Sequence, residues 1–140
     1  MRIDDRGSPD YESVRLHYIG LVDPYAIEGL MILSSTDGRE FMMRAFSGEI
    51  AKHIKSFSKG NDKTQTIYSM FEEMCEQNGD ILVKVKIYES GDALRANLYF
   101  TGKKDTILRN YRASDAVALA IFYGVPILIR STLLKEKLNA

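Results

Sequence analysis

Several residue types and motifs are scarce in this chain of 140 residues. Cys75 is the only cysteine, which excludes an internal disulfide and an all-cysteine zinc site. Nineteen Lys and Arg balance nineteen Asp and Glu, and zero net charge argues against a polyanion binder that depends on excess positive charge. No apolar run approaches the roughly 18 residues of a membrane span, and no signal-peptide pattern opens the chain. We therefore expect a cytoplasmic protein that does not interact with membranes.

Sequence motifs of the common cofactor-dependent enzymes are also absent. The chain has no GxxxxGK[ST] phosphate loop, no GxGxxG after a strand, no HExxH, no CxxC and no GxSxG. Its two histidines, His17 and His53, fall on different predicted elements, which disfavours a His/Cys metal site. These absences exclude most nucleotide-dependent and zinc-dependent classes.

The spacing of apolar residues predicts the order strands, helices, strands, helix. Asp37-Gly38 between two apolar runs is typical of a tight hairpin turn. The predicted strands cover residues 11–21, 29–33, 41–43, 80–88, 94–100, 106–111 and 127–129. The predicted helices begin at Ser47, at Thr64 or Thr66, near Asp115 and at Ser131.

This order predicts an α+β fold, with a mixed, largely antiparallel sheet and helices packed against it. Residues 1–11 are polar and contain Gly, Ser and Pro close together, so we interpret them as a flexible arm. Residues 12–140 then form a single domain, as their number suggests.

The same periodicity predicts which side chains face the core. In the second helix the predicted inward stripe is Ile67, Met70, Phe71 and Met74. In the strand over 80–88 the predicted core residues are Ile81, Val83, Val85 and Ile87. The opposite, outward face of the central strands carries cations among aromatic residues: Lys84, Lys86, Tyr88, Arg95, Asn97 and Tyr99. That face suits nucleic acid, a subunit interface or plain solvation, and the sequence leaves the three open.

The first candidate site lies between a predicted strand and the helix near residue 115. Ser114 or Asp115 could cap that helix, and Arg112 just before it could bind an anion at the helix end. Asp115 could also hold a divalent cation or act as a base. The structural alternative is a helix cap with an Arg–Asp ion pair that fixes the corner.

The second candidate is the pair Glu49 and His53, four residues apart on a predicted helix. A carboxylate beside a histidine orients the ring and raises its basicity, which is how a general base is built. An exposed helical ion pair has the same spacing.

The segments Arg112–Ala120 (RASDAVALA) and Gly124–Ile127 (GVPI) resemble the bifunctional nuclease domain family. Its members carry Arg-Pro-Ser-Asp-Ala, an apolar helix and a Gly-x-Pro-Ile exit. Met43–Ala51 (MRAFSGEIA) is similar to a family segment with a strand end, a helix start and a Glu. The similarity extends from about Ser13 to Leu134, and it implies an α+β fold, cleavage of DNA and RNA, and homodimers.

Two positions depart from the family pattern. Ala113 replaces the proline after the arginine, and Thr66-Ile67-Tyr68 replaces Thr-His-Asp at the start of the second helix. The family residues that carry over are Glu49, Thr66, Arg112, Ser114 and Asp115.

The resemblance thus implies a metal-assisted nuclease in which Asp115 and Glu49 hold Mg²⁺ or Mn²⁺. Asp115, Glu49 and His53 are then the expected catalytic residues. The expected substrate-binding residues are Arg112, Ser114, Thr66, Lys84, Lys86 and Arg95. Two alternatives stay open: a non-catalytic homodimer that binds a protein partner or an anionic ligand, and a nucleic-acid binder that does not cleave.

Overall fold

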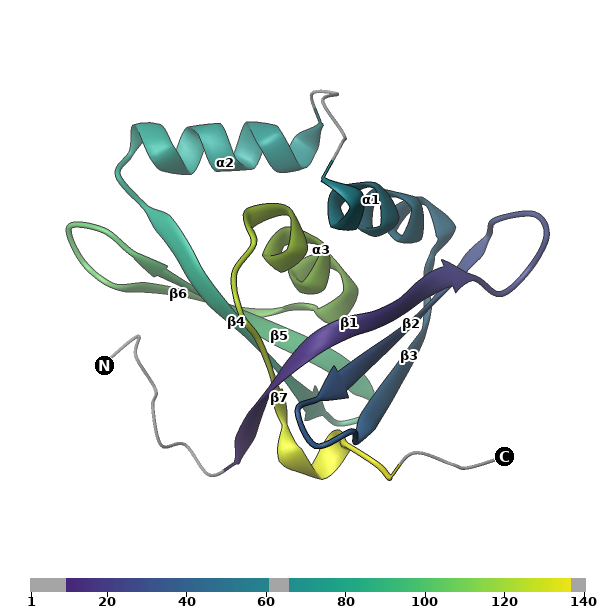
Figure 1. The fold of residues 1–140 in the computed structure, drawn as a ribbon. Coiled ribbons are helices and arrows are strands. Elements are labelled where there is room, and N and C mark those ends of the chain that lie inside the picture. The colour runs from purple at the N-terminus through teal and green to yellow at the C-terminus, as the bar shows by residue number, and fades with distance from the viewer. Residues whose placement is uncertain (1–9, 61–65, 137–140) are drawn as a thin grey trace.

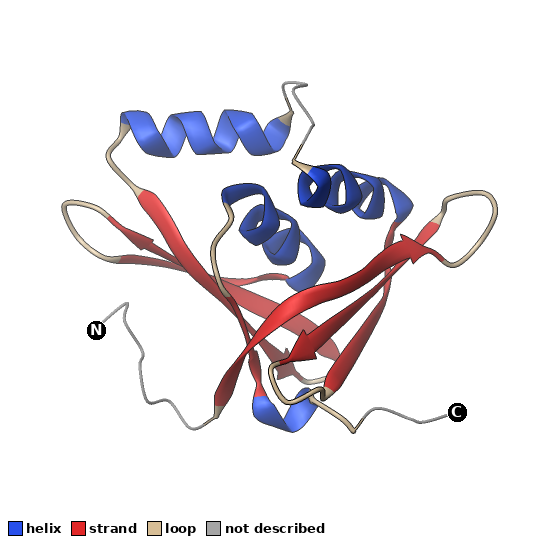
Figure 2. Ribbon diagram, viewed as in Figure 1, coloured by secondary structure: helices blue, strands red, loops and turns tan. Residues whose placement is uncertain are grey.

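The computed structural model describes residues 10–60 and 66–136, and these form one curled sheet with helices on its concave side (Figures 1 and 2). The sheet order is β3-β2-β1-β7-β4-β5-β6, and β4–β7 is the parallel pair among otherwise antiparallel neighbours. The strands are β1 (Tyr11–Leu21), β2 (Glu28–Ser35), β3 (Glu40–Ser47), β4 (Ile81–Ser90), β5 (Ala93–Thr101), β6 (Thr106–Arg112) and β7 (Ile127–Arg130). The helices are α1 (Gly48–Lys59), α2 (Ile67–Gln77), α3 (Ala113–Tyr123) and the 3₁₀ turn η1 (Ser131–Leu133). The predicted α+β class is confirmed.

Local signals in the sequence account for most element ends. The Ser47 hydroxyl accepts a hydrogen bond from the Ile50 N–H at 3.2 Å and caps α1. Gly38, at φ 92°, makes the predicted turn between β2 and β3, and Gly124, at φ 76°, ends α3. The last helix begins at Ser131 as predicted, but its N-cap residue is Arg130. Residues 1–9 of the expected arm, and Thr64, lie outside the described residues.

Helix α3 occupies the centre of the concave side, between the two arms of the sheet (Figure 1). Its small side chains allow a close approach to the strands, and Ala116, Val117, Ala118 and Ala120 are fully buried. Helix α1 packs beside it and buries Ile54 completely. Helices α1 and α3 are thereby fixed next to each other. No helix in the described part of the chain has the length and apolarity needed to cross a membrane.

Strand β4 departs from the predicted alternation at its start. The pairing with β5 shifts register between Leu82 and Lys84, and the shift turns Leu82 into the core. Ile81, predicted to face the core, is therefore 57% exposed. Val85 and Ile87, beyond the shift, are buried as predicted.

Helix α2 faces the core with a different stripe from the one predicted. Its buried or half-buried side is formed by Tyr68, Phe71 and Cys75, and Phe71 packs edge-on against Phe100 of β5 at 5.9 Å between ring centroids. The other predicted stripe residues are exposed: Ile67, Met70 and Met74. Both stripes have helical spacing, and the structure buries the one with the aromatic rings.

Helix α1 depends on a glycine at its first residue. The Gly48 N–H donates to the Ile27 carbonyl at 3.0 Å, and a Cβ at Gly48 would lie 1.9 Å from the Ala26 carbonyl oxygen. Gly48→Ala should therefore lower the free energy of unfolding by about 1–3 kcal/mol, the usual cost of overpacking. Urea denaturation measures the change. Ser56→Ala in the same helix is the control and should stay within about 0.5 kcal/mol of the parent; equal stabilities for the two variants would contradict the close approach.

Candidate active site

Helix α1 presents Glu49 and His53 one turn apart, near its N-terminus. The Nε2 atom of His53 lies 3.7 Å from Oε1 of Glu49, so the predicted pair forms. The Glu49 side chain is 79% exposed, whereas that of His53 is 29% exposed. The carboxylate can therefore orient an imidazole that is largely held by the protein.

The imidazole of His53 belongs to an aromatic cluster with Phe57, Tyr68 and Phe122. His53 lies 5.3 Å from the Tyr68 ring and 5.8 Å from the Phe57 ring, between centroids. Phe57 in turn lies 5.0 Å from both Tyr68 and Phe122. The cluster joins α1, α2 and α3, which are distant in sequence.

The junction of β6 and α3 carries Arg112 and Asp115. Arg112 is the N-cap residue of α3, with no side-chain capping hydrogen bond, and Asp115 lies in the first turn. The predicted cap by Ser114 or Asp115 is therefore wrong. The predicted ion pair is present, because Arg112 Nε donates to Asp115 Oδ2 at 3.0 Å. The acidic side chain near the helix N-terminus is favourable for the helix dipole.

Tyr68 connects these two corners. Its side chain is only 9% exposed, and burial is the main reason that its pKa is raised. The negative charges of Asp115 and Glu49 raise the pKa further, and the positive charge of Arg112 lowers it. Charges on α1 and at the β6–α3 junction thus act on the Tyr68 hydroxyl.

A shallow pocket of about 310 Å³ opens beside this hydroxyl. Its lining residues come from α2 and α3: Ile67, Tyr68, Phe71, Asp115 and Leu119. Sequence reasoning marked Tyr68 as a departure from the family pattern but did not place it in the site. Its position in the Thr66-Ile67-Tyr68 segment was the available signal.

Two carboxylates, Glu49 and Asp115, are the oxygen donors that this site offers to a cation. Mg²⁺ and Mn²⁺ prefer such ligands, and Mg²⁺ commonly takes one or two carboxylates together with water and substrate phosphate. Within residues 10–60 and 66–136 no group of three or more His, Cys, Asp and Glu side chains could hold a metal. Within the described residues the structure thus shows no closed protein cage for a metal ion.

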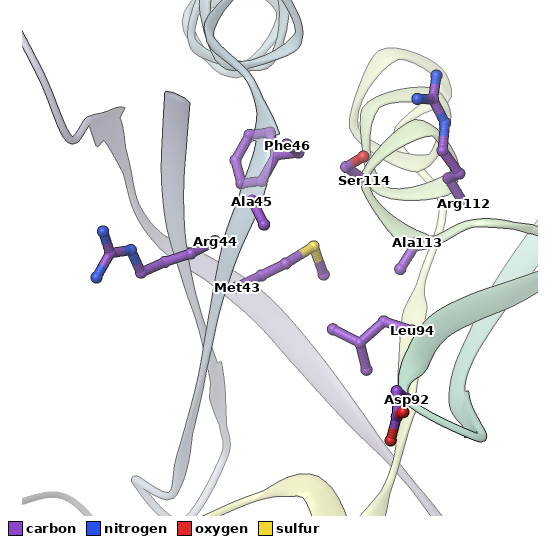
Figure 3. Close-up of a pocket in the computed structure, with 9 residues that line it drawn as sticks. All are labelled: Met43, Arg44, Ala45, Phe46, Asp92, Leu94, Arg112, Ala113 and Ser114. Atoms are coloured by element: carbon purple, nitrogen blue, oxygen red, sulfur yellow. The ribbon is translucent and has the colours of Figure 1, made fainter. Parts of the chain in front are cut away.

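Two further predicted site residues, Thr66 and Ser114, do not line the Tyr68 pocket. Thr66 caps α2, where its hydroxyl accepts from the Ser69 N–H at 3.3 Å and its own N–H donates to Ser69 Oγ at 2.8 Å. Ser114 is buried and lines a second pocket of about 240 Å³ between β3 and the start of α3 (Figure 3). Met43 and Leu94 point into that pocket, while the charged ends of its two arginines point away from it (Figure 3).

The sheet cations Lys84, Lys86 and Arg95 lie on the face away from the helices. Lys86 lies on this outward face as predicted, but it is covered there. The residue is 4% exposed, and its Nζ lies 4.7 Å from the Tyr11 ring centroid and 5.4 Å from that of Tyr99. Burial lowers the pKa of Lys86. Lys84 Nζ also lies over the Tyr99 ring, at 5.2 Å. The sheet itself separates these cations from the Tyr68 pocket.

The sequence model of the bifunctional nuclease domain matches residues 31–139. The chain belongs to the bifunctional nuclease domain family. The matched span starts within β2 and includes every candidate site residue. No curated protein matches the chain.

The family assignment explains why one departure from the family pattern is tolerated. Ala113 is the first residue of α3, the helix position at which proline is favoured, so alanine can replace the family proline there without a change of geometry. The other departure alters chemistry. Tyr68 places a neutral phenol where the family pattern has a carboxylate.

The raised pKa of Tyr68 gives a test of its environment by pH. In the unfolded chain the phenol ionises near its ordinary pKa of 10.0, while in the folded chain it holds its proton to higher pH. The unfolded state then binds fewer protons, so stability falls as pH rises above about 10. Tyr68→Phe lacks the ionisable hydroxyl, so it should lose less stability than the parent as the pH rises.

The measurement is urea denaturation of the parent and Tyr68→Phe at about pH 9 and about pH 11. The parent should lose more stability between the two than the variant does. Tyr25→Phe, which alters an exposed ring, is the control. Equal losses in parent and Tyr68→Phe would contradict the buried, charge-surrounded phenol.

Proposed function

We propose that this member of the bifunctional nuclease domain family hydrolyses phosphodiester bonds of DNA and RNA at the Tyr68 pocket. The observation that supports the proposal is the set of neighbours of Tyr68. The His53 ring lies 5.3 Å from the Tyr68 ring, Asp115 lines the same pocket, and Glu49 and Arg112 contact His53 and Asp115 respectively. These side chains supply a base, a phosphate-binding cation and two oxygen donors, which phosphoryl transfer to water requires.

Each side chain has a role that follows from its contacts. His53, oriented by Glu49, accepts a proton from the attacking water. The Arg112 guanidinium, on a side chain that is 70% exposed, stabilises charge on the phosphoryl oxygens. Glu49 and Asp115 hold Mg²⁺ or Mn²⁺, which when bound polarises the phosphate and lowers the pKa of its water ligands.

Tyr68 contributes a hydrogen-bond donor in this proposal. Its raised pKa keeps the hydroxyl protonated at neutral pH, so the group can donate to an anionic oxygen in the pocket. The phenol thereby supports phosphate binding at a position where a carboxylate would repel it.

A second candidate function is a non-catalytic homodimer that binds an anionic ligand or a protein partner at the same corner. Two observations favour it: both carboxylates already form ion pairs, and Ile67-Tyr68 replaces the family His-Asp. In either case we propose a cytoplasmic homodimer. The two functions predict different effects on activity when the negative charge of Asp115 is removed.

Asp115→Asn should reduce the cleavage rate of labelled single-stranded RNA and double-stranded DNA at least ~100-fold, as loss of a charge-stabilising group commonly does. The fold should survive, because the first-turn charge is worth at most about 1 kcal/mol. The measurement is cleavage by purified protein with Mg²⁺, Mn²⁺ or EDTA.

Asp105→Asn, an exposed change of the same kind in the β5–β6 turn, is the control and should leave the rate unchanged. Equal cleavage by the parent and Asp115→Asn would overturn the assignment. A folded parent without metal-dependent cleavage would favour the binding function.

A further inference from the structure

A groove lies between α1 and the C-terminal part of β1. These two elements lie side by side in Figure 1. Its volume is about 450 Å³, a size that suits a small ring system. The lining residues are Tyr18, Ile19, Gly20, Leu21, Ala51, Lys52 and Lys55. The family match covers Ala51, Lys52 and Lys55 but not the lining residues of β1, and the candidate active site uses none of the groove residues.

Tyr18 is positioned in the groove by Gly20. A Cβ at Gly20 would lie 2.3 Å from the Tyr18 hydroxyl oxygen and 2.7 Å from Cζ, so the ring lies across the glycine. The β1–β2 register shifts at Tyr18, and β7 pairs only with Tyr11–Val14 of β1. The ring therefore lies where β1 has no second neighbour among the described strands, and it is 47% exposed.

Three lysines follow one face of α1 beside this ring. Lys52, Lys55 and Lys59 are exposed and span about 10 Å along the helix axis. A hollow of about 280 Å³ lies between them and Ser56. Among the described residues, no carboxylate forms an ion pair with any of the three.

This arrangement carries an electrostatic cost without a ligand. Like charges three and four residues apart on a helix destabilise it. A row of anionic groups at similar spacing would remove that repulsion. Nucleic acid offers such a row, together with bases that stack on aromatic rings.

We propose that this groove binds single-stranded nucleic acid, with a base stacked on Tyr18 and successive phosphates on Lys52, Lys55 and Lys59. A base inside a duplex is already stacked on its neighbours and cannot reach the ring, so single strands are preferred. Helix α1 also carries Glu49 and His53, so the strand would bind a helix that contributes to the candidate active site. The inference rests on the proposed nuclease function for the identity of its ligand.

The test is fluorescence anisotropy of labelled single-stranded oligonucleotides, in EDTA, so that binding is measured without cleavage. Lys52→Gln/Lys55→Gln should weaken binding and reduce the slope of log Kd against log salt by about 1.4, the value for two lost single-strand phosphate contacts. Lys103→Gln/Lys104→Gln, exposed in the β5–β6 turn, makes the same charge change and should leave both quantities unchanged.

Tyr18→Leu should weaken binding about 10-fold while the salt slope stays constant, because stacking is lost and no phosphate contact is. Tyr18→Phe keeps the ring and should bind like the parent. Equal losses from the two lysine pairs, an unchanged Kd in Tyr18→Leu, or equal affinity for duplex would overturn the inference. Competition by poly-glutamate as strong as by the oligonucleotide would also overturn it, since negative charge alone would then suffice.

The two proposals fail separately. Specific binding without cleavage under any metal condition would contradict hydrolysis and leave the groove intact. Cleavage by a parent whose binding is unaffected by changes at Tyr18 and the lysines would contradict the groove alone.

Discussion

Contact among the rings of His53, Phe57, Tyr68 and Phe122 holds three helices in one arrangement, and the charged groups of the candidate site depend on it. Tyr68 is the buried residue of α2 and anchors the N-terminal end of this helix. The outer face of α2 is mostly exposed. Its burial places a phenol between Glu49 on α1 and Asp115 on α3. A cluster with an apolar interior and a charged rim lowers the local dielectric, so the charges act more strongly on that hydroxyl.

Much of this architecture follows from local sequence signals. The Ser47 and Thr66 caps, the Asp37-Gly38 turn and the Gly124 exit are short-range devices, and each was predicted from neighbouring residues. Two errors have a physical cause in tertiary packing. A register shift in β4 turned Ile81 outward, and α2 buried its aromatic stripe in place of its methionine stripe. The position of Tyr68 against α1 and α3 depends on contacts between helices far apart in the chain, which periodicity does not encode.

The division of charge over the molecule also follows from the structure. Net charge is zero, yet α1 concentrates lysines on one flank while the cations of the outer sheet face lie against tyrosine rings. The sequence left nucleic acid, a subunit interface and solvation open for the outer sheet face, and it did not show that Lys86 would be covered. The exposed lysines proposed to bind a polyanion, Lys52, Lys55 and Lys59, belong to the helix that also carries His53. The proposed binding surface and the proposed base therefore share one rigid element.

The central claim is that Glu49 and Asp115 act in one site. A double-mutant cycle of Glu49→Gln and Asp115→Asn, measured by metal-dependent cleavage, tests it directly. If the two carboxylates act together, the double variant should lose far less activity than the product of the two single losses. Single losses that multiply, within the roughly 0.5 kcal/mol expected for independent sites, would contradict the account.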